Sequence, residues 1–239
     1  WKFLSDLSPE SIVAAIDFRY IQDALSPEEA LHILKLGQSQ KIENEAKVLR
    51  FGLPAYTTSP GWLGYDDEKM LALTKNAIAD GFRMVKYKCG RNLDEDKRRL
   101  STLRNEFGSR LTIAVDANQA WDVDTAILWI EELRQFDLLW VEEPTHPEDV
   151  VGHATIAAKV APIPIATGEM AASRLTFKQL MQLDGQSIVQ IDASRVGGVN
   201  ENLAIILMAR KFNKPICPHA GGVGLCEMVQ HLAFFDAVA

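Results

Sequence analysis

Short apolar runs of β type alternate with helix-length amphipathic segments from residue 55 to the end of the chain. The β-type runs occupy residues 55–58, 83–89, 111–117, 138–143, 163–168, 188–192 and 215–219. Apolar residues recur at helical spacing in the segments between them, including 68–80, 122–136 and 199–212. This alternation predicts an α/β fold in which a parallel sheet is connected by helical crossovers.

Two closures of such a sheet are open: a doubly wound open sheet and a (β/α)₈ TIM barrel. An open sheet usually carries a glycine-rich phosphate loop after its first strand, and the segment 57–62 contains no GxGxxG motif. Acidic residues instead stand at the carboxyl ends of several β-type runs, at the face where barrels build their active sites. We therefore predict a TIM barrel with seven of its eight strand–helix units in this chain.

The residues before the first β-type run predict helices. Ser8-Pro9 and Ser26-Pro27 each place a capping hydroxyl before a proline at the first helical position. Glu29 completes a capping box with Ser26. We expect residues 1–51 to form a helical segment that precedes the barrel.

Composition and charge exclude several classes of function. The net charge is −7 and no basic stripe is interleaved with aromatic residues, which argues against a nucleic-acid partner and an anionic membrane surface. No apolar run approaches the roughly 20 residues that a membrane helix needs. The scattered thiols Cys89, Cys217 and Cys226 argue against a disulfide framework or a zinc–thiolate site and fit a reducing compartment. We expect a cytoplasmic protein, with an organelle as the alternative.

Three acidic residues end β-type runs at intervals of one strand-plus-helix unit: Asp116, Glu142 and Glu169. A carboxylate at the end of a buried strand is costly unless a positive group meets it. Three of them at matched spacing predict oxygen ligands for one hard divalent cation, Mg²⁺ in particular. Each acid taken alone could instead be a helix N-cap or a loop salt bridge.

Two lysines, Lys86 and Lys88, lie in the second β-type run. The period of two in a strand places both side chains on one face. If that face points into the barrel, positive neighbours and partial burial would lower a lysine pKa and make it a usable base. The alternative is a solvent-exposed pair on an edge strand.

Asp192 and His219 end the sixth and seventh β-type runs. A carboxylate beside an imidazole holds it in one tautomer, which suits a general acid or base. A His after a strand is otherwise often structural. A Ser-His-Asp hydrolase is a poor fit because no GxSxG elbow occurs.

These motifs together resemble the enolase superfamily, in its mandelate-racemase-like branch. The matching residues are Lys86-x-Lys88, Asp116-x-Asn118, Glu142-Glu143-Pro144, Gly168-Glu169, Asp192 and His219. Within that branch, the chain is most similar to L-fuconate dehydratases in the segments 17–20, 54–59, 61–65, 196–202 and 218–227.

The resemblance implies a modified, enolase-like TIM barrel and a role for each site residue. Mg²⁺ would be held by Asp116, Glu142 and Glu169, and Lys88 would be the base. The remaining implied roles are as follows: Lys86 beside the base and at the substrate carboxylate, Asp192 orienting His219, His219 giving a proton to the departing 3-hydroxyl, and Asn118 and Trp62 contacting the substrate.

The implied activity is Mg²⁺-dependent dehydration of an acid sugar, L-fuconate or a close relative, to a 2-keto-3-deoxy acid sugar through an enediolate. The alternatives are a racemase or epimerase of a 2-hydroxy acid and a non-catalytic binding relative. The expected partners are a small acid sugar and further copies of the same chain. Residues 1–51 are expected to link to a capping domain outside this chain, and 52–239 to form a barrel domain that is incomplete at its carboxyl end.

Overall fold

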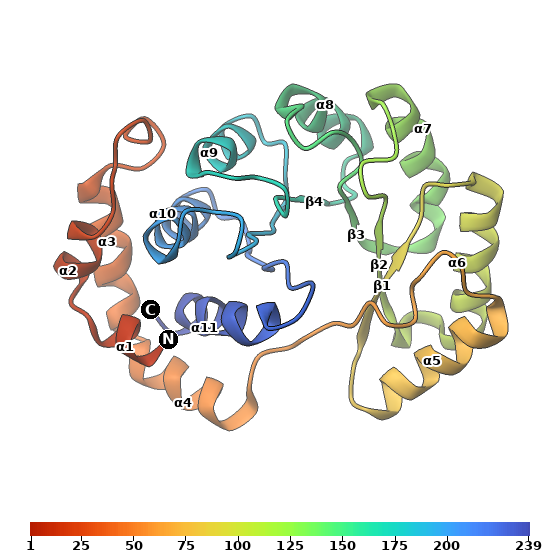
Figure 1. Ribbon diagram of the computed structural model, residues 1–239, viewed down its shortest axis with the longest axis horizontal. Helices are drawn as coiled ribbons and strands as arrows, with labels where there is room; N and C mark the ends of the chain where they lie inside the picture. Colours follow the sequence, from red (N-terminus) through yellow and green to blue (C-terminus); the bar gives the residue numbers. More distant parts are fainter. The chain divides into compact units, whose positions relative to one another are not determined.

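The computed structural model describes residues 1–239, which divide into two compact units (Figure 1). The central unit comprises residues 54–166. The terminal unit combines residues 1–53 with residues 167–239. The chain enters the central unit after residue 53 and leaves it within strand β4, Ile165–Thr167. The predicted domain boundary after residue 51 concerns the complete protein and stays a prediction.

The central unit is built on parallel strands that pair in chain order: β1 (Met84–Lys88), β2 (Thr112–Asp116), β3 (Leu138–Glu142) and the start of β4. Lys88 is in register with Asp116, and Asp116 is in register with Glu142. The carboxyl ends of β1, β2 and β3 are therefore aligned. This alignment sets the positions of the predicted site residues in this unit.

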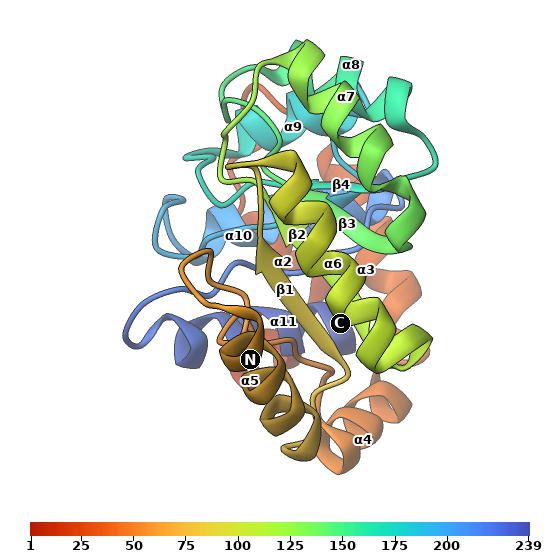
Figure 2. The same cartoon turned by 90° about the vertical axis from the view of Figure 1, so that its right-hand side faces the viewer.

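Helices of the central unit pack on its sheet, and Figure 2 shows α6 running beside β1. They are α5 (Asp67–Ala79), α6 (Leu93–Phe107), α7 (Val123–Leu133) and α8 (Val150–Val160), with 3₁₀ turns at Gly108–Arg110 and Arg134–Phe136. Each of the four helices begins after an Asp or Asn whose side chain accepts a hydrogen bond from a backbone N–H of the first turn. Their apolar faces and the strands share one buried core.

The terminal unit is mainly helical. Its helices are α1 (Lys2–Asp6), α2 (Pro9–Ala14), α3 (Pro27–Gln38), α4 (Lys41–Phe51), α9 (Arg174–Gln182), α10 (Val199–Lys211) and α11 (Leu225–Val238). Helix α10 is buried along most of its length and lies in the core of this unit with residues of α2, α3 and α9. Strand β5 (Ile188–Val189) is short, and isolated bridges join Val189 to Ile216 and Asp192 to His219.

Most of the predicted elements are confirmed. Helices cover the expected segments 68–80, 122–136 and 199–212 to within one or two residues, and both bonds of the Ser26–Glu29 capping box are present. The β-type runs 55–58 and 215–219 form only isolated bridges instead of strands. Pro54 and Pro60 lie on either side of the first run, and Pro215 and Pro218 lie within the second. A proline has no N–H to give to a sheet.

No helix combines the length and the apolar character that crossing a membrane would require.

Candidate active site

A row of charged side chains occupies the carboxyl ends of three adjacent strands in the central unit. Lys88, Asp116 and Glu142 stand at successive paired positions of β1, β2 and β3. Asp116 and Glu142 are fully buried, whereas the Lys88 side chain is partly accessible. Paired positions on parallel strands present their side chains to the same face, so the row forms one continuous polar edge.

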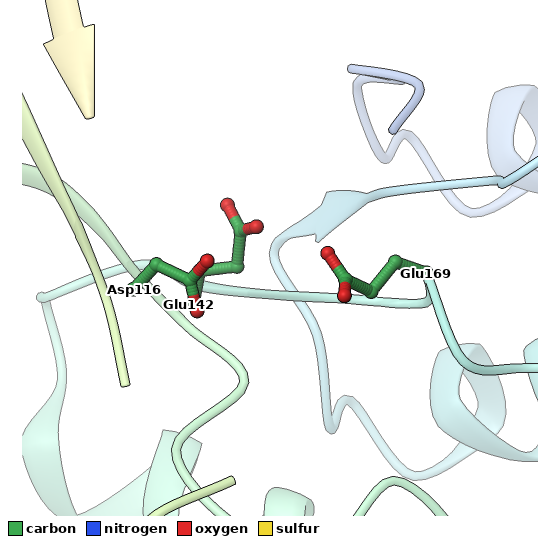
Figure 3. A group of neighbouring side chains, drawn as sticks. All are labelled: Asp116, Glu142 and Glu169. Atoms are coloured by element: carbon green, nitrogen blue, oxygen red, sulfur yellow. The ribbon is translucent and has the colours of Figure 1, made fainter. Parts of the chain in front are cut away.

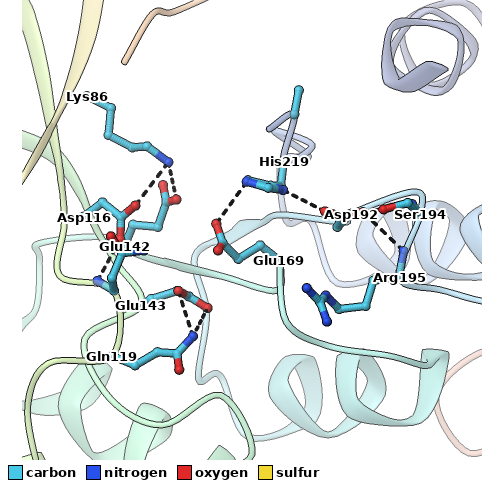
Figure 4. A network of polar contacts seen from close by, with 12 residues as sticks. Lys86, Asp116, Gln119, Glu142, Glu143, Glu169, Asp192, Ser194, Arg195 and His219 are labelled. Atoms are coloured by element: carbon cyan, nitrogen blue, oxygen red, sulfur yellow. Dashed lines mark hydrogen bonds and ion pairs between the residues drawn. The ribbon is translucent and has the colours of Figure 1, made fainter. Parts of the chain in front are cut away.

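Both lysines of β1 meet carboxylates of this row, and Figure 4 shows the contacts of Lys86. Lys88 Nζ lies 2.6 Å from Asp116 Oδ2. Lys86 Nζ donates a hydrogen bond to Glu142 Oε1 and lies 3.6 Å from Asp116 Oδ2. Trp140 Nε1 donates to the other oxygen of Glu142 at 3.0 Å. The structure therefore brings together four predicted site residues of the central unit.

The charge of Lys86 is fixed by its surroundings. Burial lowers the pKa of Lys86, but Glu142, Tyr56 and Asp116 together raise it by more than burial lowers it. The pKa of Lys86 therefore lies above its ordinary value. For Lys86 this differs from the lowering that burial alone predicts, because the carboxylates outweigh the loss of hydration. Lys86 is therefore an ammonium cation beside two carboxylates.

The turns after β2 and β3 contain residues with unusual backbone angles. Asn118, Gln119 and Glu143 all have positive φ, at 45°, 64° and 42°. Gln119 Nε2 lies 3.1 Å from both carboxylate oxygens of Glu143, and the Gln119 N–H donates to the Glu143 carbonyl at 2.8 Å. Backbone strain of this kind concentrates at functional sites. No pattern in the sequence predicts a role for this pair, although Glu143 directly follows the predicted ligand Glu142.

The two predicted substrate contacts lie on the surface of the central unit. Trp62 is 55% exposed, in the loop before α5. Asn118 is also exposed, and its N–H donates to Asp116 Oδ1 at 2.9 Å. Both side chains are free to meet a ligand, and their contact with a substrate stays a prediction.

Glu169 follows β4 in the terminal unit. Gly168, which precedes it, has φ of 137°, and a Cβ there would lie 2.6 Å from Phe177 and 2.8 Å from the Gln190 carbonyl. Only glycine fits this turn, and the Glu169 side chain that follows it is 16% exposed. Figure 3 draws the three predicted ligands, of which Asp116 and Glu142 belong to the central unit and Glu169 to the terminal unit.

His219 and Asp192 form the pair that the sequence predicts, within the terminal unit. His219 Nδ1 lies 2.8 Å from Asp192 Oδ2, and His219 Nε2 lies 3.3 Å from Glu169 Oε2 (Figure 4). Burial raises the pKa of Asp192, but hydrogen bonds from Ser194 and His219 lower it more, so the net pKa is below its ordinary value. An anionic Asp192 accepts the Nδ1 proton of the imidazole and leaves Nε2 to face Glu169.

The donor chemistry of the predicted ligands fits a hard cation. All of their candidate donor atoms are carboxylate oxygens, the type of ligand that Mg²⁺ prefers, and none is a thiolate or an imidazole. In the central unit, Asp116 and Glu142 offer such oxygens from neighbouring strands, and the Lys86 ammonium group lies beside both.

Comparison with known proteins places the chain in a family. A family model described as Enolase C-terminal domain-like matches residues 69–239. The chain belongs to this family, and its fold is a fragment of the enolase-superfamily TIM barrel. The predicted family and fold class are confirmed.

Individual relatives refine the comparison. Mitochondrial enolase superfamily member 1 of Homo sapiens is 50% identical over 241 residues, covering 100% of this chain and 54% of the relative, and its crystal structure superposes with a TM-score of 0.97. L-galactonate dehydratase of Hypocrea jecorina is 46% identical over 245 residues, with 100% of this chain and 54% of the relative covered.

A solved structure also carries a metal. L-talarate/galactarate dehydratase from Salmonella typhimurium LT2, liganded with Mg and L-lyxarohydroxamate, is 36% identical with a TM-score of 0.70, covering 80% of this chain and 51% of that one. Relatives of this chain thus include acid-sugar dehydratases of the enolase superfamily. The chain spans about half the length of the curated relatives it matches.

Proposed function

We propose that the protein containing this chain catalyses the Mg²⁺-dependent dehydration of an acid sugar to a 2-keto-3-deoxy acid sugar. The observation that carries the proposal is the row Lys88–Asp116–Glu142, which sets a candidate base beside two buried carboxylates on adjacent strands. The Asp192–His219 pair and the acid-sugar dehydratases among the relatives support it further.

Asp116, Glu142 and Glu169 would hold Mg²⁺. When bound, the cation would hold the substrate carboxylate and stabilise the negative charge that develops on it. The all-oxygen donor set supports this assignment, as does the Mg in the structure of the Salmonella relative. Lys86 would reinforce the same effect, since its ammonium group lies beside Glu142 and Asp116.

Lys88 would begin the reaction as the base. A neutral Lys88 Nζ would take the proton from the α-carbon, and the electrons of that C–H bond would pass into the carboxylate to form an enediolate. The partial accessibility of the Lys88 side chain supports this role, because a substrate can reach it while the buried Lys86 stays behind it.

His219 would complete the elimination as the acid. The protonated imidazole would give its Nε2 proton to the 3-hydroxyl as the C–O bond breaks, so that water leaves and an enol remains. Asp192 would stabilise the imidazolium and orient the ring through Nδ1. The Ser194 hydroxyl donates a hydrogen bond to Asp192 and stabilises its negative charge. The enol then tautomerises to the 2-keto product.

The specific substrate is the finer part of the proposal. We infer L-fuconate or a close stereochemical relative from the resemblance in the segments 17–20, 54–59, 61–65, 196–202 and 218–227. The names of the relatives add L-galactonate, L-talarate and galactarate as candidates.

The test is incubation of the full-length protein with Mg²⁺ and these four acid sugars. We expect one or more of them to yield a 2-keto-3-deoxy acid, detected by NMR. Absence of turnover across the panel would contradict the proposal. Deuterium incorporation from D₂O at the α-carbon with no keto acid would instead favour a racemase or epimerase, since two proton carriers also suffice for that reaction.

A further inference from the structure

Helix α6 sends two buried charged side chains to the carboxyl end of β1. Asp96 and Arg99 are 2% and 3% exposed. Asp96 Oδ2 accepts a hydrogen bond from the Gly90 N–H at 2.8 Å, and Arg99 Nη1 donates to the Lys88 carbonyl at 2.9 Å. The two side chains therefore form hydrogen bonds with the backbone on either side of Cys89, and one of these bonds is to Lys88, the candidate base.

The same guanidinium reaches the loop that carries Trp62. Arg99 Nη2 donates to the Trp62 carbonyl at 3.1 Å and lies 3.4 Å from the Gly61 carbonyl. The Lys88 N–H also donates to the Gly61 carbonyl, at 2.8 Å. A Cβ at Gly61 would lie 2.2 Å from the Lys86 carbonyl, so loop and strand are in direct backbone contact.

This arrangement is an expensive way to stabilise a fold. A buried guanidinium loses its hydrogen bonds to water, and only well-placed protein acceptors replace them. An apolar side chain of similar size often stabilises a fold equally well. What the guanidinium adds is a planar set of donors in fixed geometry. Here those donors join carbonyls of Lys88 and Trp62, two residues of the candidate site.

We infer that Arg99, supported by Asp96, is a positioning residue that fixes Lys88 relative to the Trp62 loop. One guanidinium thereby sets both the place of the base and the place of a substrate contact. The catalytic part of this inference rests on the proposed dehydratase function. The structural part, that Arg99 locks the end of β1 to the loop, stands on the hydrogen bonds of the central unit alone.

A matched control exists on the same helix. Arg104 donates to the carbonyls of Phe136, Gly108, Leu111 and Asp137 at 2.7–2.9 Å. These acceptors lie outside the candidate site, next to the amino-terminal ends of β2 and β3. Arg104→Met therefore removes a comparable set of arginine–carbonyl bonds without touching Lys88 or Trp62.

The experiment compares Arg99→Met, Arg99→Lys and Arg104→Met in the full-length protein. For Arg99→Met we expect faster hydrogen exchange at the Lys88 amide and a kcat lower by about 100-fold, the typical effect of misplacing a reacting group by about 1 Å. Added guanidinium ion should restore part of that kcat. The kcat and the Lys88 exchange rate of Arg99→Lys should lie between those of the wild type and Arg99→Met, because one ammonium group cannot reach both carbonyls. Arg99→Lys also provides the test if Arg99→Met does not fold.

Arg104→Met should lower the melting temperature while leaving kcat and Lys88 exchange close to wild type. The inference is overturned if Arg99→Met and Arg99→Lys lose activity only in proportion to their loss of stability, as Arg104→Met does, and if the Lys88 amide exchanges in them as slowly as in the wild type. If the wild type turns over no acid sugar, the proposed function fails, and the exchange at Lys88 still decides whether Arg99 locks the loop.

Discussion

At the scale of single residues, the proposed mechanism uses two proton carriers with different surroundings, one in each unit. Lys88 lies against Asp116 in the central unit, and His219 lies against Asp192 in the terminal unit. An amine can take a proton from carbon only when neutral, whereas an imidazole held by an anionic carboxylate is well suited to give one to a leaving oxygen. The proposed mechanism therefore gives separate steps to the two residues.

Substitution of each carrier should separate those steps. In Lys88→Ala we expect loss of α-proton exchange and of dehydration, by about 10²–10⁴-fold, the range typical of a general base. In His219→Asn we expect dehydration to fall by a similar factor while α-proton exchange persists. NMR in D₂O measures both the exchange and the keto acid. The opposite pattern would exchange the two roles.

His153 predicts a pH dependence of stability that is unrelated to catalysis. It is fully buried in α8, with Nδ1 2.9 Å from the Asp149 carbonyl and Nε2 without a hydrogen-bond partner. Burial lowers the pKa of His153 below its ordinary value. The unfolded chain therefore binds a proton more readily than the folded one, and stability that is present above pH about 6.5 is lost as the pH falls toward the folded pKa.

Denaturant unfolding at pH 7 and pH 5 tests this effect. The free energy of unfolding should fall between these pH values in the wild type and fall less in His153→Leu, which has nothing to protonate at that position. The exposed His32 of α3, replaced in the same way, is the control and should leave the wild-type pH dependence intact. Equal pH dependence in His153→Leu and the wild type would show that His153 has no such role.

At the scale of elements, the turns after β2 and β3 are joined by Gln119 and Glu143. Both residues have positive φ, and each turn begins directly after a predicted metal ligand. The side-chain and backbone bonds between them fix one turn against the other. We therefore expect the pair to hold Asp116 and Glu142 in the geometry that a cation requires.

Gln119→Leu should weaken binding of Mg²⁺ or Mn²⁺ by about 10–100-fold, the usual effect of losing a group that orients metal ligands. Calorimetric titration of the metal into the full-length protein measures the affinity without depending on turnover. Gln135→Leu, at an exposed position of the same unit, is the matched control and should bind the metal as the wild type does. Equal affinities in the two variants would contradict the orienting role.

The same elements mark what the sequence could and could not predict. Helix starts such as Ser26–Glu29 depend on neighbouring residues, so local patterns predict them. The strand-end acids and lysines follow from periodicity, which predicts their common face. The carbonyls that Arg99 reaches and the Gln119–Glu143 pair depend on which distant segments pack together, and no local pattern encodes that. The segments 55–58 and 215–219 form isolated bridges where strands were predicted, because the prolines beside and within them lack the N–H that a strand pairing needs.

At the scale of the whole molecule, the three predicted ligands of the proposed cation site are divided between the two units. Asp116 and Glu142 belong to the central unit, and Glu169 belongs to the terminal unit, which is made of two stretches far apart in the sequence. A single cation bound by all three carboxylates would stabilise both units at once. A cation bound by Asp116 and Glu142 alone would stabilise the central unit and leave the terminal unit unchanged.

Metal addition and removal therefore test the three-ligand site. Saturating Mg²⁺ should slow hydrogen exchange in both units and stabilise the full-length protein by about 2.7 kcal/mol at a hundredfold excess over Kd, and EDTA should reverse this. Glu169→Gln should lose most of the stabilisation, as Asp116→Asn should, whereas Glu227→Gln at an exposed position of the terminal unit should keep it. Undiminished Mg²⁺ stabilisation of Glu169→Gln would exclude the terminal unit from the cation site, because its one predicted ligand would then contribute nothing.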